Sequence, residues 1–437
     1  MFAYYLRLAA NSLKRNLILT GLTIATIAIG IGGSMSTYTI YYAMSGDPIP
    51  WKSSQLFVAQ LDSLGPKSRS KSDEPPDLLS YRDTQALMRS HPALSQAAMY
   101  QTRLTVTPAD TSKAQFAVSA RATGPGFFAM FDTPFQSGRA WTAADEEARA
   151  NVVVIGSKLA ERLFNGVDAV GKSIILGGQD YRIIGVLKPW NPAPRFYDLG
   201  GDALAQSDNL FLPFTTAIDR QMQTIGHTNC DEVPDAGAGW QGLLSSNCVW
   251  IQYWLQLPTT AEATSYREFL GQYAADQQRS GRFNWSPMTR LRNVREWLVY
   301  KHVIPDEVRA IMALGFGFLL VCLITAIGLM LAKFSGRAAD LGVRRALGAS
   351  QRDLFMQCLT ETALIGALGG IAGLLLTLLG AATERSIVAE SLANVTRVDF
   401  VLVLITLLLA EVATVGAGIY PAWRASRIQP ALQLKTQ

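Results

Sequence analysis

The sequence is poor in charged residues, histidine and cysteine, and each shortage excludes a class of protein. Charged residues make up 17% of the 437 residues, and the formal net charge is only +5. Because the basic residues crowd beside apolar runs, the sequence excludes a nucleic-acid-binding protein, which needs a basic patch on a soluble face. The three histidines and four cysteines include no C-x-x-C pair and no ligand-type spacing, so we expect no metal site and no cofactor.

Signatures of an enzyme are absent or out of context. No G-x-S-x-G nucleophile motif occurs. Residues 166–173 (GVDAVGKS) match the spacing of a phosphate-binding loop, which needs a strand before it and a helix after it. Here an expected helix precedes the segment and an expected strand follows it, so we interpret it as a turn. The sequence therefore predicts no catalytic residue and no ATPase activity in this chain.

What the sequence does have is long apolar runs, four of which are long enough to span a membrane as helices. They cover residues 17–44, 308–332, 359–383 and 400–420. The first run is longer than the apolar core of a cleaved signal peptide, so we interpret it as a span. The amphipathic pattern of residues 1–16 predicts a helix on the cytoplasmic surface of the membrane.

A polar stretch at residues 45–302, between the first and second runs, predicts an α+β domain in two lobes. Strands are expected at 152–155, 181–186 and 249–257, and helices at 157–164 and 261–278. Residues 290–305 begin with an amphipathic pattern and predict a stalk that leads back to the membrane.

Basic residues give the chain an orientation. They gather at the N-terminus, in residues 333–353 (the basic loop) and in the 421–437 tail, and the positive-inside rule assigns such segments to the cytoplasm. The large domain and the short 384–399 loop then lie on the other side. The expected fold is four transmembrane α-helices with a large α+β extracytoplasmic domain inserted between the first and second helix.

Two cysteines, Cys230 and Cys248, fall in the expected outer domain. An extracytoplasmic compartment is oxidising, so we predict that they form a disulfide bond. The alternative is a pair of free thiols.

The basic loop also carries the signals of a folded segment. Asp340 and Arg344 are four residues apart and can pair on one helical face. Gly348 stands where a helix would end, and Ser350 with Asp353 forms the pattern of a capping box. We therefore predict a short helix between the second and third spans. The alternative is a basic loop that only fixes orientation.

Small and ionisable residues inside the spans indicate how the helices pack. Gly366 with Gly370, and Gly369 with Gly373, form two overlapping small-residue motifs in the third span. Glu411 lies near the middle of the fourth span, where an acid is a functional candidate by default. We favour a protonated Glu411 bonded to a neighbouring helix over a role in moving charge.

The layout and several motifs resemble the permeases of MacB/FtsX-type ABC transporters, the type VII or mechanotransmission class. The resemblance rests on R-x-x-D-L-G-V-R-R-A-L-G-A at 337–349, on the start of the third span at 357–373, and on G-x-x-P-A-x-x-A-S-x-x-x-P-A-L at 418–432. Segments between 123 and 186 are similar to the periplasmic domain of that family. The loop of the family usually carries Glu-Ile where this chain has Asp340 and Leu341, and the shorter acid is expected to weaken a contact with the partner.

The resemblance implies partners and a site. The partners would be a separate ABC ATPase subunit, a second permease (a homodimer or a sister chain), a periplasmic adaptor, an outer-membrane duct and membrane lipid, with no nucleic acid. The ATPase-coupling residues would be Arg337, Asp340, Leu341, Arg344, Arg345 and Leu347.

The same resemblance implies a multi-pass protein of the bacterial inner membrane with both termini in the cytoplasm. Its expected function is the export of a peptide, antibiotic-like or siderophore-like cargo, driven by ATP hydrolysis in the partner. The alternatives are an FtsX-like signalling scaffold that drives a cell-wall hydrolase, and a permease that extracts lipoproteins. The large outer domain favours export.

Overall fold

The computed structural model describes residues 2–65, 74–92, 94–108, 114–201, 203–232, 234, 236–387 and 400–427. The chain divides into two compact units, which we call the membrane unit (Met1–Ser45 with Ile304–Gln437) and the soluble unit (Gly46–Val303). Most of the expected outer loop and C-terminal tail, residues 388–399 and 428–437, lies outside the described residues.

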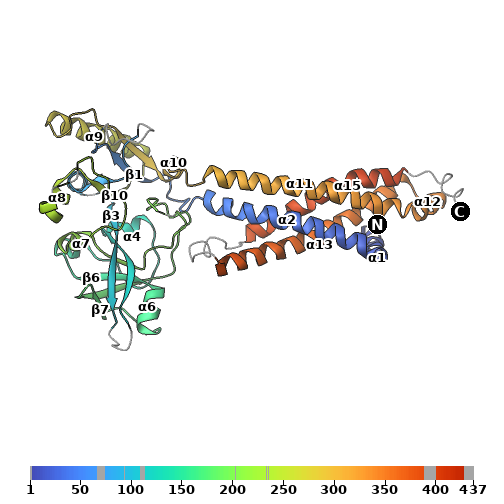
Figure 1. Cartoon of the computed structure of the whole chain (residues 1–437), viewed down its shortest axis with the longest axis horizontal. Helices are drawn as coiled ribbons and strands as arrows, with labels where there is room; N and C mark the ends of the chain where they lie inside the picture. The colour runs from blue at the N-terminus through green and yellow to red at the C-terminus, as the bar shows by residue number, and fades with distance from the viewer. Residues whose placement is uncertain are drawn as a thin grey trace. The chain divides into compact units, whose positions relative to one another are not determined.

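The membrane unit is a bundle of long helices. Its helices are α1 (Phe2–Arg15), α2 (Leu17–Ser45), α11 (Asp306–Ser335), α12 (Ala338–Ala346), α13 (Gln351–Ile387) and α15 (Phe400–Ser426). Among the described helices, α2, α11, α13 and α15 are long and apolar enough to cross a membrane. In Figure 1 these four run alongside one another, with α2 packed on α11 and α13, and α15 packed on α13.

All four helices extend beyond the apolar runs that predicted them, and α13 and α15 extend furthest. α13 begins at Gln351, before its apolar run starts at 359, because the capping box expected at Ser350 and Asp353 opens the helix there. α15 continues through Pro421 to Ser426, whereas the proline was expected to follow the span. Proline is tolerated inside such helices because neighbouring helices and local adjustments satisfy the freed backbone groups.

The soluble unit is built on one sheet, which has eleven strands among the described residues. The strands are β1 (Leu56–Leu61), β2 (Leu79–Ser80), β3 (Gln96–Thr107), β4 (Phe116–Thr123), β5 (Phe135–Gly138), β6 (Val152–Gly156), β7 (Ser173–Leu176), β8 (Gln179–Leu187), β9 (Leu210–Pro213), β10 (Val249–Gln256) and β11 (Thr289–Asn293). The order is β11-β1-β10-β3-β4-β9-β6-β8-β5, with β2 beside β10 and β7 beside β3 and β8. The sequence predicted two lobes, but one continuous sheet runs through this part of the chain, which forms a single compact unit.

Helices and aromatic side chains cover the sheet. The helices are α3 (Tyr81–Ser90), α4 (Gly126–Met130), α5 (Ala143–Glu147), α6 (Ser157–Phe164), α7 (Phe214–Asp219), α8 (Gly239–Ser245), α9 (Thr260–Arg279) and α10 (Val294–Tyr300). One buried cluster includes Leu270 of α9, and a second includes Phe127 of α4 and Trp297 of α10. The strands and helices expected between 152 and 278 are confirmed. Residues 290–305, where a stalk is expected, begin within strand β11, which pairs with β1, and continue as helix α10 from Val294; their role as a stalk stays a prediction.

Candidate functional site

The basic loop folds into one short helix, α12, and defined signals mark its end and the start of the next helix. Gly348 has φ +100°, a left-handed conformation that suits glycine, and it follows the end of the helix. α13 then begins with the expected capping box, in which the Asp353 backbone N–H donates to Ser350 Oγ (3.2 Å) and the Ser350 backbone N–H donates to Asp353 Oδ2 (3.1 Å). The helix predicted in this loop is confirmed, and Figure 1 shows it at the same end of the bundle as α1.

The ion pair expected within α12 does not form. Asp340 Oδ2 lies 2.5 Å from Arg15 Nη1 of α1, and Arg344 Nη1 donates to Gln357 Oε1 of α13 at 2.7 Å. A pair four residues apart on an exposed helix is worth only about 0.2–0.5 kcal/mol, so partners on neighbouring helices prevail. α12 is therefore tied to both α1 and α13.

Two residues expected on an outer docking surface point into the membrane unit. Arg337 Nη1 donates to Glu361 Oε2 of α13 at 3.0 Å and to Ser12 Oγ of α1, and only 11% of the Arg337 side chain is exposed. Leu341 is buried in the core of the unit. These two side chains hold α12 in place and leave little surface exposed for a partner, so the docking role expected for them stays a prediction.

Glu361 also meets a second cation. Lys333 Nζ lies 2.7 Å from Glu361 Oε1, and both side chains are buried. A buried charge costs several kcal/mol unless it is paired, which explains why two cations gather at this carboxylate. We call Lys333, Arg337 and Glu361 the Glu361 cluster. Sequence reasoning gave Lys333 and Glu361 no role, although a lone acid inside the third apolar run was the signal that could have found them.

With these side chains turned inward, α12 exposes a mixed apolar and basic surface. Leu347 is 83% exposed, and Val343, one turn earlier, is 53% exposed. Arg344 and Arg345 lie beside them and are partly exposed. Exposed apolar side chains among arginines are typical of protein interaction sites. We call Val343, Arg344, Arg345 and Leu347 the α12 surface.

Gly366 and Gly370 form the face of α13 that meets α15. A Cβ atom at Gly366 would lie 3.0 Å from Glu411 Oε2, and one at Gly370 would lie 2.8 Å from Ala410 Cβ. Close approach of the two helices therefore depends on both glycines. Glu411 is only partly buried, and its carboxylate lies beside this glycine face.

Gly369 and Gly373 form a second face of α13, which meets α2. A Cβ atom at Gly369 would lie 2.7 Å from Ile27 Cγ2, and one at Gly373 would lie 2.9 Å from Ile31 Cβ. The two overlapping glycine motifs in the sequence thus pack against two different helices, α15 and α2.

Residues 166–173 form a turn, as the sequence predicts. α6 ends before them, and Asn165, Gly166 and Gly171 have φ of +51°, +81° and +87°. β7 follows at Ser173. This order is the reverse of a phosphate-binding loop, so the segment supports no nucleotide site.

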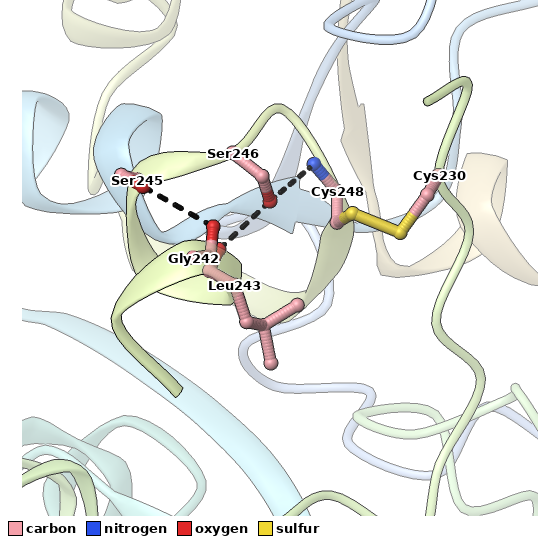
Figure 2. The surroundings of a disulfide bond; sticks show 6 residues. All are labelled: Cys230, Gly242, Leu243, Ser245, Ser246 and Cys248. Carbon is pink, nitrogen blue, oxygen red and sulfur yellow. Dashed lines mark hydrogen bonds between the residues drawn. A yellow bond between two sulfur atoms is a disulfide. The ribbon is translucent and has the colours of Figure 1, made fainter. Parts of the chain in front are cut away.

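Cys230 and Cys248 are joined by a disulfide bond in the soluble unit (Figure 2). The Cys248 backbone N–H donates to Ser246 Oγ at 3.1 Å, just after α8. Cys248 directly precedes β10, and Asn229, next to Cys230, forms a β-bridge with Val249. The bond therefore fixes an irregular stretch of chain to the residue directly before a central strand.

The histidines have separate structural environments. His91 packs against the ring of Phe269, with centroids 4.3 Å apart. His227 Nε2 lies 2.6 Å from the carbonyl oxygen of Gly200, and His302 belongs to the turn after α10. Within the described ranges, no group of three His, Cys, Asp or Glu side chains could hold a metal ion.

Comparison with known proteins matches both units. The model of the MacB-like periplasmic core domain matches residues 20–252, and that of the FtsX-like permease C-terminal domain matches residues 312–430.

The relatives are similar over most of this chain. The macrolide export ATP-binding/permease protein MacB of Azoarcus sp. (strain BH72) is 24% identical over 99% of this chain and 59% of its own length. The pyoverdine export ATP-binding/permease protein PvdT of Pseudomonas syringae pv. tomato (strain ATCC BAA-871 / DC3000) is 26% identical over 71% of this chain and 42% of its own length. This chain thus spans about half the length of the curated relatives it matches.

Among solved structures, the periplasmic region of MacB from Actinobacillus actinomycetemcomitans aligns with a TM-score of 0.36 and 14% identity, over 56% of this chain and 92% of that one. The family models carry more weight, because the first covers more than half of the chain and the second covers α13, α15 and most of α11. The chain therefore belongs to the MacB/FtsX-type family of ABC transporter permeases.

Proposed function

We propose that this chain is the permease subunit of an ABC exporter and that a separate ATPase subunit docks on the α12 surface. The observation that carries the proposal is the exposed pair Val343 and Leu347, presented with two arginines on a helix whose other face is anchored. An apolar centre with surrounding arginines is the usual composition of a protein interface.

Contacts of α12 provide a route by which a docked ATPase moves the membrane helices. Arg344 binds Gln357 of α13, and Asp340 binds Arg15 of α1. Arg337 and the buried Glu361 add a third connection, which is costly to break. In this proposal, ATP binding and hydrolysis displace α12 together with α1 and α13, and the cargo does not pass through these helices.

The proposed orientation has α12 and both termini in the cytoplasm and the soluble unit outside it. The basic residues around α12 support this orientation through the positive-inside rule. The disulfide in the soluble unit supports an oxidising compartment. The working transporter would contain two permeases, either two copies of this chain or this chain and a sister.

The proposed cargo is a peptide, an antibiotic-like compound or a siderophore-like compound. The two named relatives are export proteins for macrolides and for pyoverdine, which supports the last two classes. A periplasmic adaptor and an outer-membrane duct would complete the route out of the cell.

The test is co-purification of the chain, in detergent, with the ATPase encoded beside its gene. We expect a stable complex that hydrolyses ATP. Leu347→Asp, and the double reversal Arg344→Glu with Arg345→Glu, should each reduce the amount of ATPase bound by at least about tenfold, because each removes part of a small interface.

The matched controls are Val167→Asp and Arg267→Glu, which change exposed residues of the soluble unit. Both should leave the complex intact. Unchanged binding in all of the α12 variants would show that the docking surface lies elsewhere. Failure of the intact chain to bind any ATPase would contradict the proposed function itself.

A further inference from the structure

The soluble unit contains a cavity of about 510 Å³ where two central strands separate. β3 and β10 are paired as far as Met99 and Gln252. Beyond this point the 224–229 segment bridges Thr102 of β3 and Val249 of β10. The cavity is lined by residues of both strands and of this segment. Its volume falls within the range of about 300–1,000 Å³ that is usual for small-molecule sites.

A buried, charge-balanced network lies at the cavity. Asp198 accepts hydrogen bonds from Arg121 Nη2 (2.5 Å) and Gln252 Nε2 (2.7 Å), and Arg121 Nε donates to Asp208 (2.5 Å). Burial alone would raise the pKa of Asp198, but Arg121 and Arg195 outweigh it and hold that pKa well below its usual range. The two arginines and two carboxylates cancel, so this wall carries no net charge.

Two buried donors at the cavity have no hydrogen-bond partner among the described residues: Arg195 Nε and Trp250 Nε1. Both residues line the cavity, and the two donor atoms are themselves covered by protein, so a ligand reaches them once these side chains turn toward it. A buried donor without a partner is unfavourable, so a ligand that brings acceptor oxygens is favoured there. The Tyr100 ring meets Trp250 edge to face, with centroids 4.9 Å apart, which adds an aromatic surface.

Another wall comes from the chain around α10. Trp297 and Tyr300 line the cavity with their rings stacked, centroids 5.6 Å apart, and Trp297 Nε1 donates to the carbonyl oxygen of Phe196 at 3.1 Å. Lys301 also lines the cavity, and its charge is matched by Asp77 at 2.5 Å. A ligand held here would touch the helix that directly precedes the second membrane span in the sequence.

We propose that this cavity binds a neutral, amide-rich ligand that carries a planar or aromatic group and has about the size of a tripeptide. Its carbonyl oxygens accept hydrogen bonds from Arg195 and Trp250. The ring of the ligand packs against the aromatic side chains of the lining. The ligand carries no net charge, which suits a cavity wall whose arginines and carboxylates cancel. Contact with Trp297 and Tyr300 then restrains α10. This site does not depend on the ATPase docking proposed above.

The test uses the full chain in lipid nanodiscs, without an ATPase. A negative result for the cavity can then be told apart from a negative result for ATPase docking. The probes are pools of N-acetylated, C-amidated tripeptides with tyrosine, lysine or glutamate at the centre. Binding is measured by saturation-transfer NMR, and the exchange of the α10 backbone amides by mass spectrometry. We expect the tyrosine pool to bind in preference to both charged pools and to slow exchange in α10.

The cavity can be blocked at Gly201, which lines it and has no heavy atom within 4 Å of an added Cβ. Gly201→Trp should weaken binding of the tyrosine pool at least about tenfold and remove the effect on α10. The control Gly271→Trp, on α9, also adds a side chain in open space and should change neither.

A second variant keeps the proposal testable if Gly201→Trp does not fold. Trp250→Phe keeps the ring and removes the unpaired donor, and it should weaken binding about five- to tenfold. Absence of binding by the tyrosine pool, a preference for either charged pool, or equal binding by all variants would overturn the proposal.

Discussion

Lys333 Nζ lies 2.7 Å from Glu361 Oε1, and neither side chain reaches the surface. Arg337 binds the other oxygen of the same carboxylate at 3.0 Å. One acid of α13 therefore holds the end of α11 and the beginning of α12. These contacts hold the start of α12 in place, and none of them involves the residues of the α12 surface.

Glu361→Gln should destabilise the membrane unit by about 3–5 kcal/mol, because it leaves two buried cations without their counter-charge. Lys333→Met should cost less, because Arg337 and Glu361 remain paired. The measurement is the thermal unfolding of each purified variant in detergent.

A matched control for the Glu361 cluster is Arg15→Ala. It breaks the ion pair with Asp340. Because the Arg15 side chain is 66% exposed and the Asp340 side chain is 38% exposed, the loss of stability should stay below about 1 kcal/mol. A Lys333→Met variant less stable than Glu361→Gln would contradict the view that the shared carboxylate is the centre of the cluster.

Gly418→Ala should loosen the contact between α15 and α13. A Cβ atom at Gly418 would lie 2.2 Å from Thr362 Cγ2, so one helix must shift, at a cost of about 1–3 kcal/mol. Gly416→Ala, half a turn away, meets no heavy atom within 4 Å and should be neutral or slightly stabilising. Equal melting temperatures for the two variants would mean that the helices do not pack this closely.

Local patterns in the sequence were sufficient for much of the fold. Four long apolar runs predict four long helices because nothing else satisfies the backbone in lipid. Ser350 and Asp353 predict the start of α13 because a capping box needs only residues three apart. The glycines of α13 predict close helix packing, although which pair meets α2 and which meets α15 depends on the folded bundle.

The missed features depend on residues distant in the sequence. The resemblance assigns Arg337 to the contact with the ATPase, and no local pattern reveals that Ser12 and Glu361 bind it. The cavity in the soluble unit arises where β3 and β10, which are far apart in the chain, stop pairing and the 224–229 segment intervenes. Such a gap follows from the order of strands in the sheet, which alternation of apolar residues does not specify.

Removal of the disulfide by Cys230→Ala with Cys248→Ala should lower the free energy of unfolding of the soluble unit by about 3 kcal/mol. The bond closes a loop with a sequence separation of 18, and its loss frees that loop in the unfolded chain. Tryptophan fluorescence during urea unfolding measures the change, and reduction of the wild-type chain should reproduce it. Cys322→Ala, at a free cysteine of the membrane unit, should leave this transition unchanged; a double variant as stable as the wild type would contradict the prediction.

Acid should weaken the soluble unit through Asp198. Burial raises the pKa of this carboxyl, but Arg121 and Arg195 outweigh burial and leave the pKa well below its usual range. The folded state then binds fewer protons than the unfolded state, so the stabilisation is complete above about pH 4, near the unfolded pKa, and is lost as pH falls below it. Asp198→Asn should lower stability at pH 7 and flatten the dependence between about pH 4 and pH 2, as urea unfolding at each pH would reveal. Asp180→Asn changes an exposed carboxylate of β8 and serves as the control, which should keep the wild-type dependence on pH. If Asp198→Asn also kept the wild-type dependence, the ion pairs of Asp198 with Arg121 and Arg195 would not be what stabilises the unit against acid.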